Sequence, residues 1–425
     1  MKELNKMTEL KEIPSDWKFV KLGEVIEKII GGGTPFKENE EFWEPEIPWA
    51  TVKDLKGTIL SNTEDFISHK GLKGSSANLI PEYTLIIATR MALGKAVFFN
   101  REVAINQDLK AIFPKPELSK YFLSYWFALN SDMILTMGSG STVKGIRLEV
   151  LKSFSFLLPP LPEQQKIATI LSTVDEKIEV IDAQITQTRE LKKGLMQKLL
   201  TRGIGHTKFQ DSVLGEIPES WEVSNLESHS HFITKGSTPT TYGFEWQESG
   251  ITFLRSECVS PNGFILSGAM HISEEANNAM ERSKIKGGDI LMTITGNVGR
   301  TCIYPLEYNE GNINQHIARI RISDSLLLPQ FVFQYLSQAS IITEYLKITT
   351  GQAYPQLSLK QVRETKIPLP SVEEQQKIAS ILSTVDEKLK TQKEKKTEYQ
   401  QLKKGLMQQL LTGKVRVLQS ELEIA

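Results

Sequence analysis

Cysteine is scarce in this chain: only Cys258 and Cys302 occur among 425 residues, and they form no CxxC pair. A structural zinc site is therefore not expected, and nothing indicates an oxidising compartment. No apolar run approaches the ~20 residues of a membrane span. The N-terminal MKELNKMTELKE also lacks the apolar core of a signal peptide. These absences favour a cytoplasmic protein without a membrane segment.

An excess of either charge is missing too. The chain has 50 Lys and Arg residues against 51 Asp and Glu residues, which gives a net charge of −1. This balance argues against a whole surface that binds polyanions, but it permits a local basic face. A chain of this length is expected to hold two or three domains with ample core.

Catalytic signatures are absent as well. No GxxxxGK[ST] phosphate loop occurs, since Gly140–Gly145 has the wrong order of residues, and the clusters Gly31–Gly33 and Gly138–Gly140 are predicted to be turns. Pro159-Pro160 lacks the flanking polar and aromatic residues of an amino-methyltransferase site. The pair His229-Ser-His231 has no counterpart in the first half and is predicted to lie on the surface. We expect no catalytic residue, metal or cofactor in this chain.

What the chain has is a long internal repeat. EQQKIATILSTVDEKI, from Glu163, returns as EQQKIASILSTVDEKL from Glu374, an offset of 211. LKKGLMQKLLT, from Leu191, returns at the same offset as LKKGLMQQLLT from Leu402. The chain is therefore built twice, and it should present two similar surfaces related by an approximate twofold.

Weaker matches extend the repeat towards the N-terminus. They are Ile13–Trp17 with Ile217–Trp221, Gly33–Pro35 with Ser237–Pro239, and Ile105–Gln107 with Ile313–Gln315. Because these offsets drift from 204 to 208, insertions and deletions separate the two halves. We expect one shared fold whose variable surfaces bind different things.

Short β-rich runs and single helices alternate in each half, which is typical of an α+β domain of roughly 150 residues. Predicted strands lie at Thr84–Ala88, Ala96–Phe99 and Asp289–Ile294, and predicted helices at Ser119–Leu129 and Pro329–Gln338. Gly, Pro and Asn residues punctuate these segments.

A helix of about 40 residues follows each globular part. The first begins after Leu158–Pro162, with Pro162 tolerated in the first turn. The second begins at Ser371, which forms a predicted capping box with Glu374. Apolar residues at heptad positions predict a coiled coil: Ile167, Leu171, Val174, Ile178, Ile181 and Ile185 in the first helix, and Ile378, Leu382, Val385, Leu389, Leu406 and Leu410 in the second. The alternative is that each helix packs only on its own domain.

The two helices are expected to run antiparallel. Each spans roughly 60 Å, whereas the connection from Arg202 to Glu216 reaches at most ~50 Å, so the second helix must return along the first. The predicted segments are a globular domain at 1–160, a long helix at 161–203, a linker at 204–215, a second globular domain at 216–370, a second long helix at 371–413 and a tail at 414–425.

Polar loops carry cations, amides and an aromatic residue at corresponding places in the two halves. Arg, Lys, Asn and Gln side chains make the phosphate and base contacts used on duplex DNA. The candidate DNA-binding residues are Thr34, Lys37, Lys53, Arg90, Lys95 and Lys144 in the first half, and Lys235, Thr240, Arg255, Asn297, Arg300, Gln352, Tyr354 and Gln356 in the second.

These motifs together resemble the DNA sequence-specificity (S) subunit of type I restriction–modification enzymes. The resemblance spans nearly the whole chain. It rests on the IPxxW and Thr-Pro motifs, on Gly351–Ser358, on the Pro-Leu-Pro hinge, and on the repeated EQQKIAxIL and LKKGLMQxLL. The first half departs from the pattern at Gly138–Lys144, where the second half has Gln-Ala-Tyr-Pro-Gln.

The resemblance implies two target recognition domains, each reading one half of a split double-stranded DNA sequence. It implies long helices that set the gap between the half-sites and help to dock two modification (methyltransferase) subunits. S-adenosylmethionine would belong to those subunits, and ATP and Mg to restriction and translocase subunits.

Two other kinds of protein remain as alternatives to this non-catalytic subunit. One is a free-standing DNA-binding repressor or coiled-coil scaffold, which would bind specific DNA tightly without a partner. The other is a fused restriction–modification enzyme, against which the missing methyltransferase and ATPase motifs argue.

Overall fold

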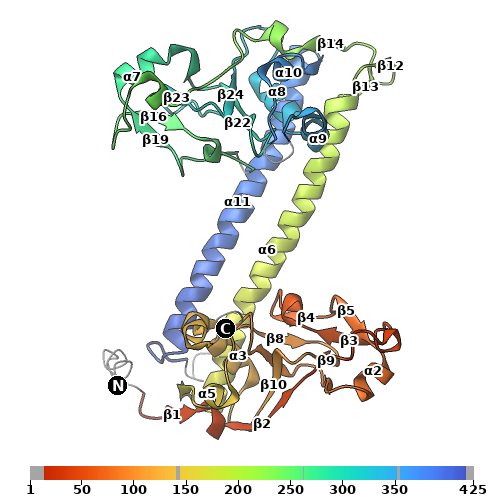
Figure 1. Ribbon diagram of the computed structural model, residues 1–425, viewed down its shortest axis with the longest axis vertical. Coiled ribbons are helices and arrows are strands. Elements are labelled where there is room, and N and C mark those ends of the chain that lie inside the picture. Colours follow the sequence, from red (N-terminus) through yellow and green to blue (C-terminus); the bar gives the residue numbers. More distant parts are fainter. Residues whose placement is uncertain (1–13, 140–143, 262, 352–354, 418–425) are drawn as a thin grey trace, which may run out of the picture. The chain divides into compact units, whose positions relative to one another are not determined.

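The computed structural model describes residues 14–139, 144–261, 263–351 and 355–417. The chain divides into two compact units. Unit 1 runs to Asp182 and resumes at Glu394, and unit 2 is Ala183–Lys393. Each unit contains one globular domain and a stretch of both long helices, α6 (Leu161–Arg202) and α11 (Val372–Leu410) (Figure 1). No helix in the described part of the chain is long and apolar enough to cross a membrane.

The globular domain of unit 1 is built on two sheets. The first has the order β2 (Ile26–Gly31), β10 (Leu109–Pro114), β7 (Leu85–Ala88), β8 (Ala96–Phe99) and β4 (Ile59–Leu60). The second has the order β5 (Asp65–Ile67), β3 (Ile47–Ala50), β9 (Val103–Ile105) and β6 (Asn78–Ile80). A separate antiparallel pair joins β1 (Lys18–Lys21) to β11 (Ser155–Leu158). The helices are α2 (His69–Lys73), α3 (Lys120–Leu129), α4 (Ser131–Met137) and α5 (Leu148–Lys152).

The globular domain of unit 2 repeats this plan. Its first sheet has the order β15 (Thr234–Lys235), β24 (Ile317–Ile320), β21 (Ile290–Thr293) and β22 (Thr301–Ile303). Its second has the order β19 (Met270–Ile272), β16 (Ile251–Leu254), β23 (Gly311–Ile313) and β20 (Lys284–Ile285). The strands β14 (Glu222–Asn225) and β25 (Lys366–Leu369) pair as β1 and β11 do. The helices are α7 (Glu274–Ala279), α8 (Pro329–Leu336), α9 (Ala339–Ile348) and α10 (Leu359–Arg363).

Two hairpins in unit 2 complete the described strands. The first joins β12 (Phe209–Ser212) to β13 (Gly215–Pro218), and the second joins β17 (Val259–Ser260) to β18 (Gly263–Phe264). The first hairpin therefore occupies most of the segment 204–215 that was expected to be a linker. Its turn contains exposed Val213 and ends at Gly215, whose φ is +87°.

The strands and short helices predicted from apolar runs are present as β7, β8, β21, α3 and α8. Every residue of β7 and β21 is buried, which explains why both read as continuous apolar runs rather than alternating ones. Helix α3 is capped by Ser119, whose hydroxyl accepts the Phe122 N–H, and buries an aromatic stretch in the core of unit 1. The predicted α+β class and the repeated fold are confirmed.

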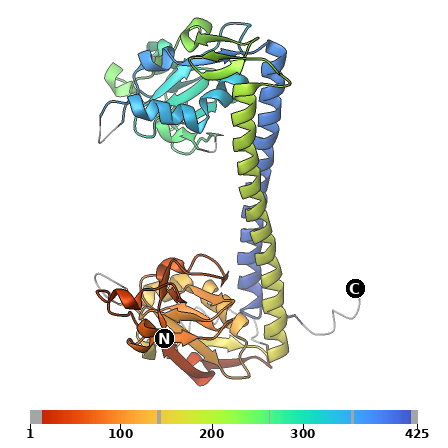
Figure 2. The ribbon, with the colours of Figure 1, turned by 90° about the vertical axis from the view of Figure 1, so that its right-hand side faces the viewer.

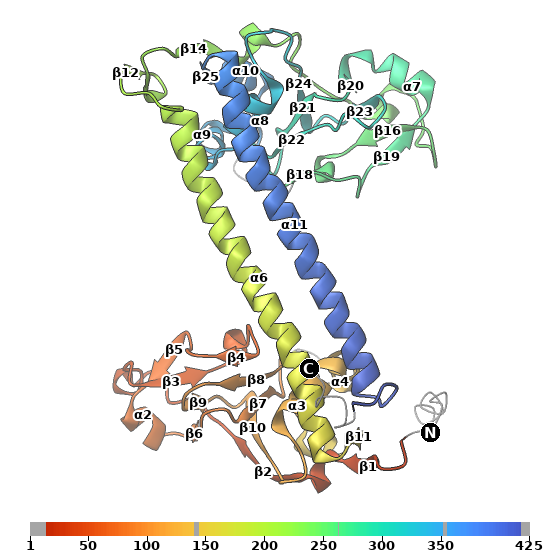
Figure 3. The ribbon, with the colours of Figure 1, turned by 180° about the vertical axis from the view of Figure 1, so that it is seen from behind.

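The long helices run antiparallel within each unit. In unit 1, Asp175 pairs with Lys403 at 2.5 Å and Asp182 with Lys396 at 2.6 Å, so residue numbers rise along α6 as they fall along α11 (Figure 2). In unit 2 the corresponding ion pair joins Lys192 to Asp386 at 2.6 Å. Figure 3 shows the backbones of α6 and α11 from behind. Lys396 thus takes part in the contact between the two helices.

The heptad residues divide into two sets. The first turns of each helix belong to its own domain, because Ile167 and Leu171 lie in the core of unit 1 and Ile378 and Leu382 in the core of unit 2. Farther along α6, Val174, Ile181 and Ile185 are buried and Ile178 is partly buried. Farther along α11, Val385, Leu389 and Leu410 are buried and Leu406 is partly buried. Packing on the domain and packing between helices therefore both occur.

Candidate nucleic-acid interface

A buried tryptophan–glutamate pair fastens each long helix to its globular domain. Trp17 donates its indole N–H to Glu163 over 2.9 Å, and Trp221 donates to Glu374 over 3.0 Å. The IPxxW motif and the first residue of EQQKI thus form one contact in each unit. Glu374 does not close the expected capping box: its N–H donates to Ser371, but its carboxylate accepts from Trp221 and the Ile204 N–H.

The next glutamine of the motif makes the same three hydrogen bonds in both units. Gln164 accepts the Ser119 N–H and donates to the carbonyls of Glu117 and Pro159. Gln375 accepts the Leu328 N–H and donates to the carbonyls of Leu326 and Pro370. Both side chains are fully buried, so each amide satisfies backbone groups that would otherwise be orphaned. The repeated Glu-Gln is therefore explained by anchoring inside the chain.

A repeated aspartate joins each domain to both helices. Asp175 on α6 accepts the Tyr125 hydroxyl and pairs with Lys403 on α11. At the 211 offset, Asp386 accepts the Gln334 amide and pairs with Lys192. Burial first, and then the Asp175 charge, raise the pKa of Tyr125 well above its usual range, so this hydroxyl stays a donor.

The Thr-Pro motif is held by the Ile-Asn-Gln motif in each unit. Thr34 donates its hydroxyl hydrogen bond to Gln107 over 2.5 Å, and Thr238 donates to Gln315 over 2.9 Å. The glycine before each motif permits a close approach: a Cβ at Gly32 would lie 1.8 Å from the Ile105 carbonyl oxygen, with the same crowding at Gly236. The segment Gly31–Gly33, predicted to be a turn, is instead a place where the backbone packs closely against the Ile105 carbonyl.

The turn between β7 and β8 gathers three sequence-predicted cations of unit 1. Arg90 forms an isolated β-bridge with Gly145, and the Met91 N–H donates to the Lys144 carbonyl over 3.1 Å. The Arg90 guanidinium is half-exposed and lies 3.4 Å from the Asp108 carboxylate, while the Lys144 side chain is exposed. On the other side of the turn, the Lys95 ammonium donates a hydrogen bond to the Leu55 carbonyl.

The equivalent turn of unit 2, between β21 and β22, presents different side chains. Thr295 forms an isolated β-bridge with Gln356, as Arg90 does with Gly145. The Gly296 N–H donates a hydrogen bond to the Pro355 carbonyl. Asn297 and Gln356 are exposed there, and Arg300 is partly exposed at the end of the turn. Gln352 and Tyr354, predicted to contact DNA, lie outside the described residues.

The other sequence-predicted candidates lie apart from these two turns. Lys53 pairs with Asp65 at 2.7 Å and with Glu64 at 3.5 Å, and the hydrogen bond to Asp65 raises its pKa. Arg255 pairs with Glu257 at 2.7 Å. The side chains of the remaining candidates are exposed on separate loops or strands; they are Lys37, Lys235 and Thr240.

A family model for the type I restriction modification DNA specificity domain matches residues 14–189 and again 218–401. The chain belongs to this family. Each match contains one globular domain and most of the long helix that follows it, which is the repeating unit seen in the fold.

Individual relatives agree with this assignment. The MjaX type I restriction enzyme specificity subunit of Methanocaldococcus jannaschii is 30% identical over 97% of this chain and 96% of its own length. The MjaVIII specificity subunit of that organism is 28% identical over 95% and 94%. A crystal structure of the S subunit of a type I system from M. genitalium has a TM-score of 0.59 at 17% identity, covering 95% of this chain and 98% of that one. The likeness to the M. genitalium structure supports the assignment of the fold.

The repeated LKKGLMQ motif has a structural feature that was not predicted from the sequence. Leu191 and Leu402 leave 52% and 50% of their surface exposed at equivalent helix positions. Three residues later, the space around Gly194 and Gly405 is open, because an added Cβ would have no atom within 4 Å beyond its chain neighbours and the nearby backbone of its own helix. The exact repetition of a glycine inside a helix was the available signal, because glycine weakens a helix interior.

The C-terminal tail supplies another residue that sequence reasoning missed. Arg416 donates to both Glu163 and Asp16, and these contacts raise its pKa. In unit 2, His206 contacts Glu374 at 2.9 Å in the corresponding place.

The histidine pair is a correction to the sequence prediction. His229 is buried, with Nδ1 2.6 Å from the Asp324 carboxylate, so only His231 is an exposed surface residue.

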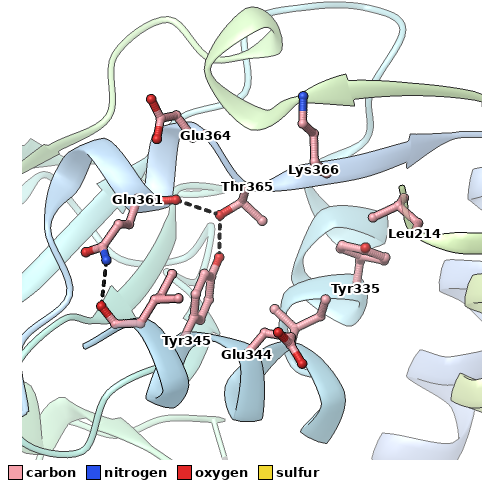
Figure 4. A pocket seen from close by; sticks show the side chains of 10 residues that line it. Leu214, Tyr335, Glu344, Tyr345, Gln361, Glu364, Thr365 and Lys366 are labelled. Carbon is pink, nitrogen blue, oxygen red and sulfur yellow. Dashed lines mark hydrogen bonds between the residues drawn. The ribbon is translucent and has the colours of Figure 1, made fainter. Parts of the chain in front are cut away.

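A cavity of about 310 Å³ lies in unit 2. Figure 4 shows Tyr345 hydrogen-bonded to Thr365, with Leu214 and Tyr335 on the opposite side. The residue of unit 1 that precedes β11 as Thr365 precedes β25 is Phe154, which is buried against Trp126. A threonine therefore lines the cavity of unit 2, whereas an aromatic ring packed on Trp126 stands at the equivalent position of unit 1.

Proposed function

We propose that the chain is the DNA-recognition subunit of a type I restriction–modification complex, with each globular domain reading one half of a split double-stranded target. The observation that carries this proposal is the pair of equivalent turns. One backbone frame presents Arg90 and Lys144 in unit 1 but Asn297 and Gln356 in unit 2. A shared frame with exchanged polar side chains is suited to reading two different sequences in one binding mode.

The two sets of side chains favour different contacts. Arginine offers a planar fork for guanine or for a phosphate pair, whereas asparagine and glutamine match adenine. The half-sites should therefore differ in base sequence, as expected when the repeated helices are nearly identical and the loops are not. In this proposal, chemistry on DNA belongs to partner subunits.

The partners in this proposal are two modification subunits together with restriction and translocase subunits. Exposed Leu191 beside bare Gly194 offers an apolar surface where another chain can approach the helix backbone closely, and Leu402 beside Gly405 offers the same surface again. Two copies of one surface suit two copies of one partner. S-adenosylmethionine, ATP and Mg would be bound by those partners, and the assembly would be cytoplasmic.

The test is methylation mapping of the reconstituted complex. The chain is combined with the modification subunits of its own system, and methylated positions on plasmid and genomic DNA are read by long-read sequencing. We expect a single split sequence with a fixed gap. The chain alone and the modification subunits alone serve as controls and should leave DNA unmethylated at that sequence.

Two outcomes would contradict the proposal. Methylation of the same sequence without this chain would remove its recognition role. A contiguous target that responds to changes in one globular domain only would remove the division of labour between the two domains.

A further inference from the structure

Two residues with side chains have a positive φ in the described part of the chain, Tyr83 at +51° and Met91 at +62°. The equivalent positions of unit 2 are glycines, Gly288 at +91° and Gly296 at +74°. A Cβ makes this left-handed conformation unfavourable for most residues, and glycine avoids that cost. Both turns thus favour glycine, and unit 1 keeps side chains there.

Met91 combines this strain with exposure. It leaves 61% of its surface accessible at the turn between β7 and β8, so folding gains little from burying its thioether. Its neighbours are cationic: Arg90 precedes it, and its own N–H donates to the Lys144 carbonyl. Strained residues that bring no gain in packing are concentrated at functional sites.

We propose that Met91 is an apolar wedge that contacts the bases of the half-site read by unit 1. This inference rests on the function proposed above. Methionine is among the side chains that proteins insert between base steps, and cations on either side of such a wedge hold the phosphates. Its unbranched side chain adapts to an irregular apolar gap.

The wedge makes the two domains unequal. Unit 2 has Gly296 in place of Met91, so it should read its half-site without an inserted side chain. The half-site of unit 1 should therefore contain a base step that unstacks easily, such as a pyrimidine–purine step. The ease with which that base step unstacks would add to the specificity that Arg90 provides by hydrogen bonding.

The decisive comparison uses two matched glycine substitutions in the reconstituted complex. Met91→Gly and Tyr83→Gly each relieve a left-handed residue, but the two positions lie beyond opposite ends of β7. Met91→Gly should raise the melting temperature of the chain slightly. Tyr83→Gly also removes a ring that is only 37% exposed, so its melting temperature should not rise. Met91→Gly should lower affinity for the mapped target by roughly tenfold and relax discrimination in the half-site of unit 1. Tyr83→Gly should bind DNA as wild type does, and Met91→Leu should retain most of the affinity.

A fluorescent base reports the insertion directly. Duplexes carry 2-aminopurine at successive positions of that half-site, and unstacking raises its emission. We expect an increase at one step with wild type and Tyr83→Gly, and none with Met91→Gly.

The possible failures are distinguishable. Equal affinity and equal 2-aminopurine emission for Met91→Gly and wild type would overturn the wedge alone. Normal DNA binding by Met91→Gly with weakened assembly would assign Met91 to a protein contact and also overturn it. Absence of sequence-specific binding by the wild-type complex would overturn the proposed function, and the wedge with it.

Discussion

At the scale of single residues, the proposed recognition depends on side chains that share a backbone frame. Arg90 and Asn297 are both presented by the turn that follows the central buried strand of their domain, yet one is a forked cation and the other a neutral amide. The Asp108 carboxylate lies 3.4 Å from Arg90 and leaves half of its guanidinium side chain accessible. A base or phosphate could therefore meet an oriented arginine.

Replacing these residues should affect one half-site each. Arg90→Ala should weaken discrimination in the half-site of unit 1 by about 1–3 kcal/mol, and Asn297→Ala should act only on the other half-site. Arg101→Ala is the matched control, because Arg101 is equally cationic and exposed but lies beyond the opposite end of β8. Binding titrations of the reconstituted complex on targets altered in one half at a time give the result. An equal effect of Arg90→Ala and Arg101→Ala would point to general electrostatics instead.

At the scale of elements, the repeated motifs act as fasteners between helix and domain. Glu163 is buried and accepts from both Trp17 and Arg416. Removing its carboxylate leaves the indole N–H without its acceptor and leaves Arg416 paired with Asp16 alone. A buried donor without an acceptor costs more than an exposed ion pair contributes.

Glu163→Ala should accordingly lower the free energy of unfolding by about 1–3 kcal/mol, measured by urea denaturation. Glu179→Ala, exposed on the same helix, should change it by less than about 0.5 kcal/mol. Similar small losses in both variants would show that the tryptophan–glutamate contact does not anchor the helix.

The same scale shows what the sequence could predict. Strand Ala96–Phe99 and helix Pro329–Leu336 were predictable because their apolar patterns are local. The hairpin at Phe209–Pro218 was missed, since its short strands are mostly polar and exposed. The class and the repeat followed from letter patterns alone.

The candidate site was less predictable because it depends on partners distant in sequence. Lys53 is tied to Asp65 by the placement of β5, and His229 is buried only because Asp324 lies against it. In contrast, the contact of Arg255 with Glu257 spans two residues and could have been anticipated. The assignment of polar residues to base contacts remains a prediction. Met91 could not be singled out from the sequence, because only the backbone conformation shows its positive φ.

At the scale of the whole molecule, the ends of the described chain meet within unit 1. Arg416 contacts Asp16 at 2.7 Å, whereas Val213 at the tip of the β12–β13 hairpin is 76% exposed. Joining the existing termini and opening the chain between Val213 and Leu214 should therefore preserve both units. A cut at Gly205 is less suitable, because its neighbours Ile204 and His206 contact Glu374.

This circular permutant should be soluble, melt within a few degrees of wild type and methylate the same target after reconstitution. Circular dichroism melting and methylation mapping check these expectations. A matched permutant opened between Leu291 and Met292, inside buried β21, should fail to fold. If both permutants failed, the closed arrangement of the chain ends in unit 1 would not support permutation.

In the proposed function, each globular domain carries its own half-site specificity on an interchangeable frame. The residues that dock each domain to its helix are repeated, including Glu163 and Gln164 with their equivalents Glu374 and Gln375. The most direct measurement is methylation mapping of a chain in which segments 14–160 and 218–371 are exchanged. The two half-sites should then appear in reversed order, with each base sequence retained. An unchanged order, with the exchanged chain folded and assembled, would contradict the account.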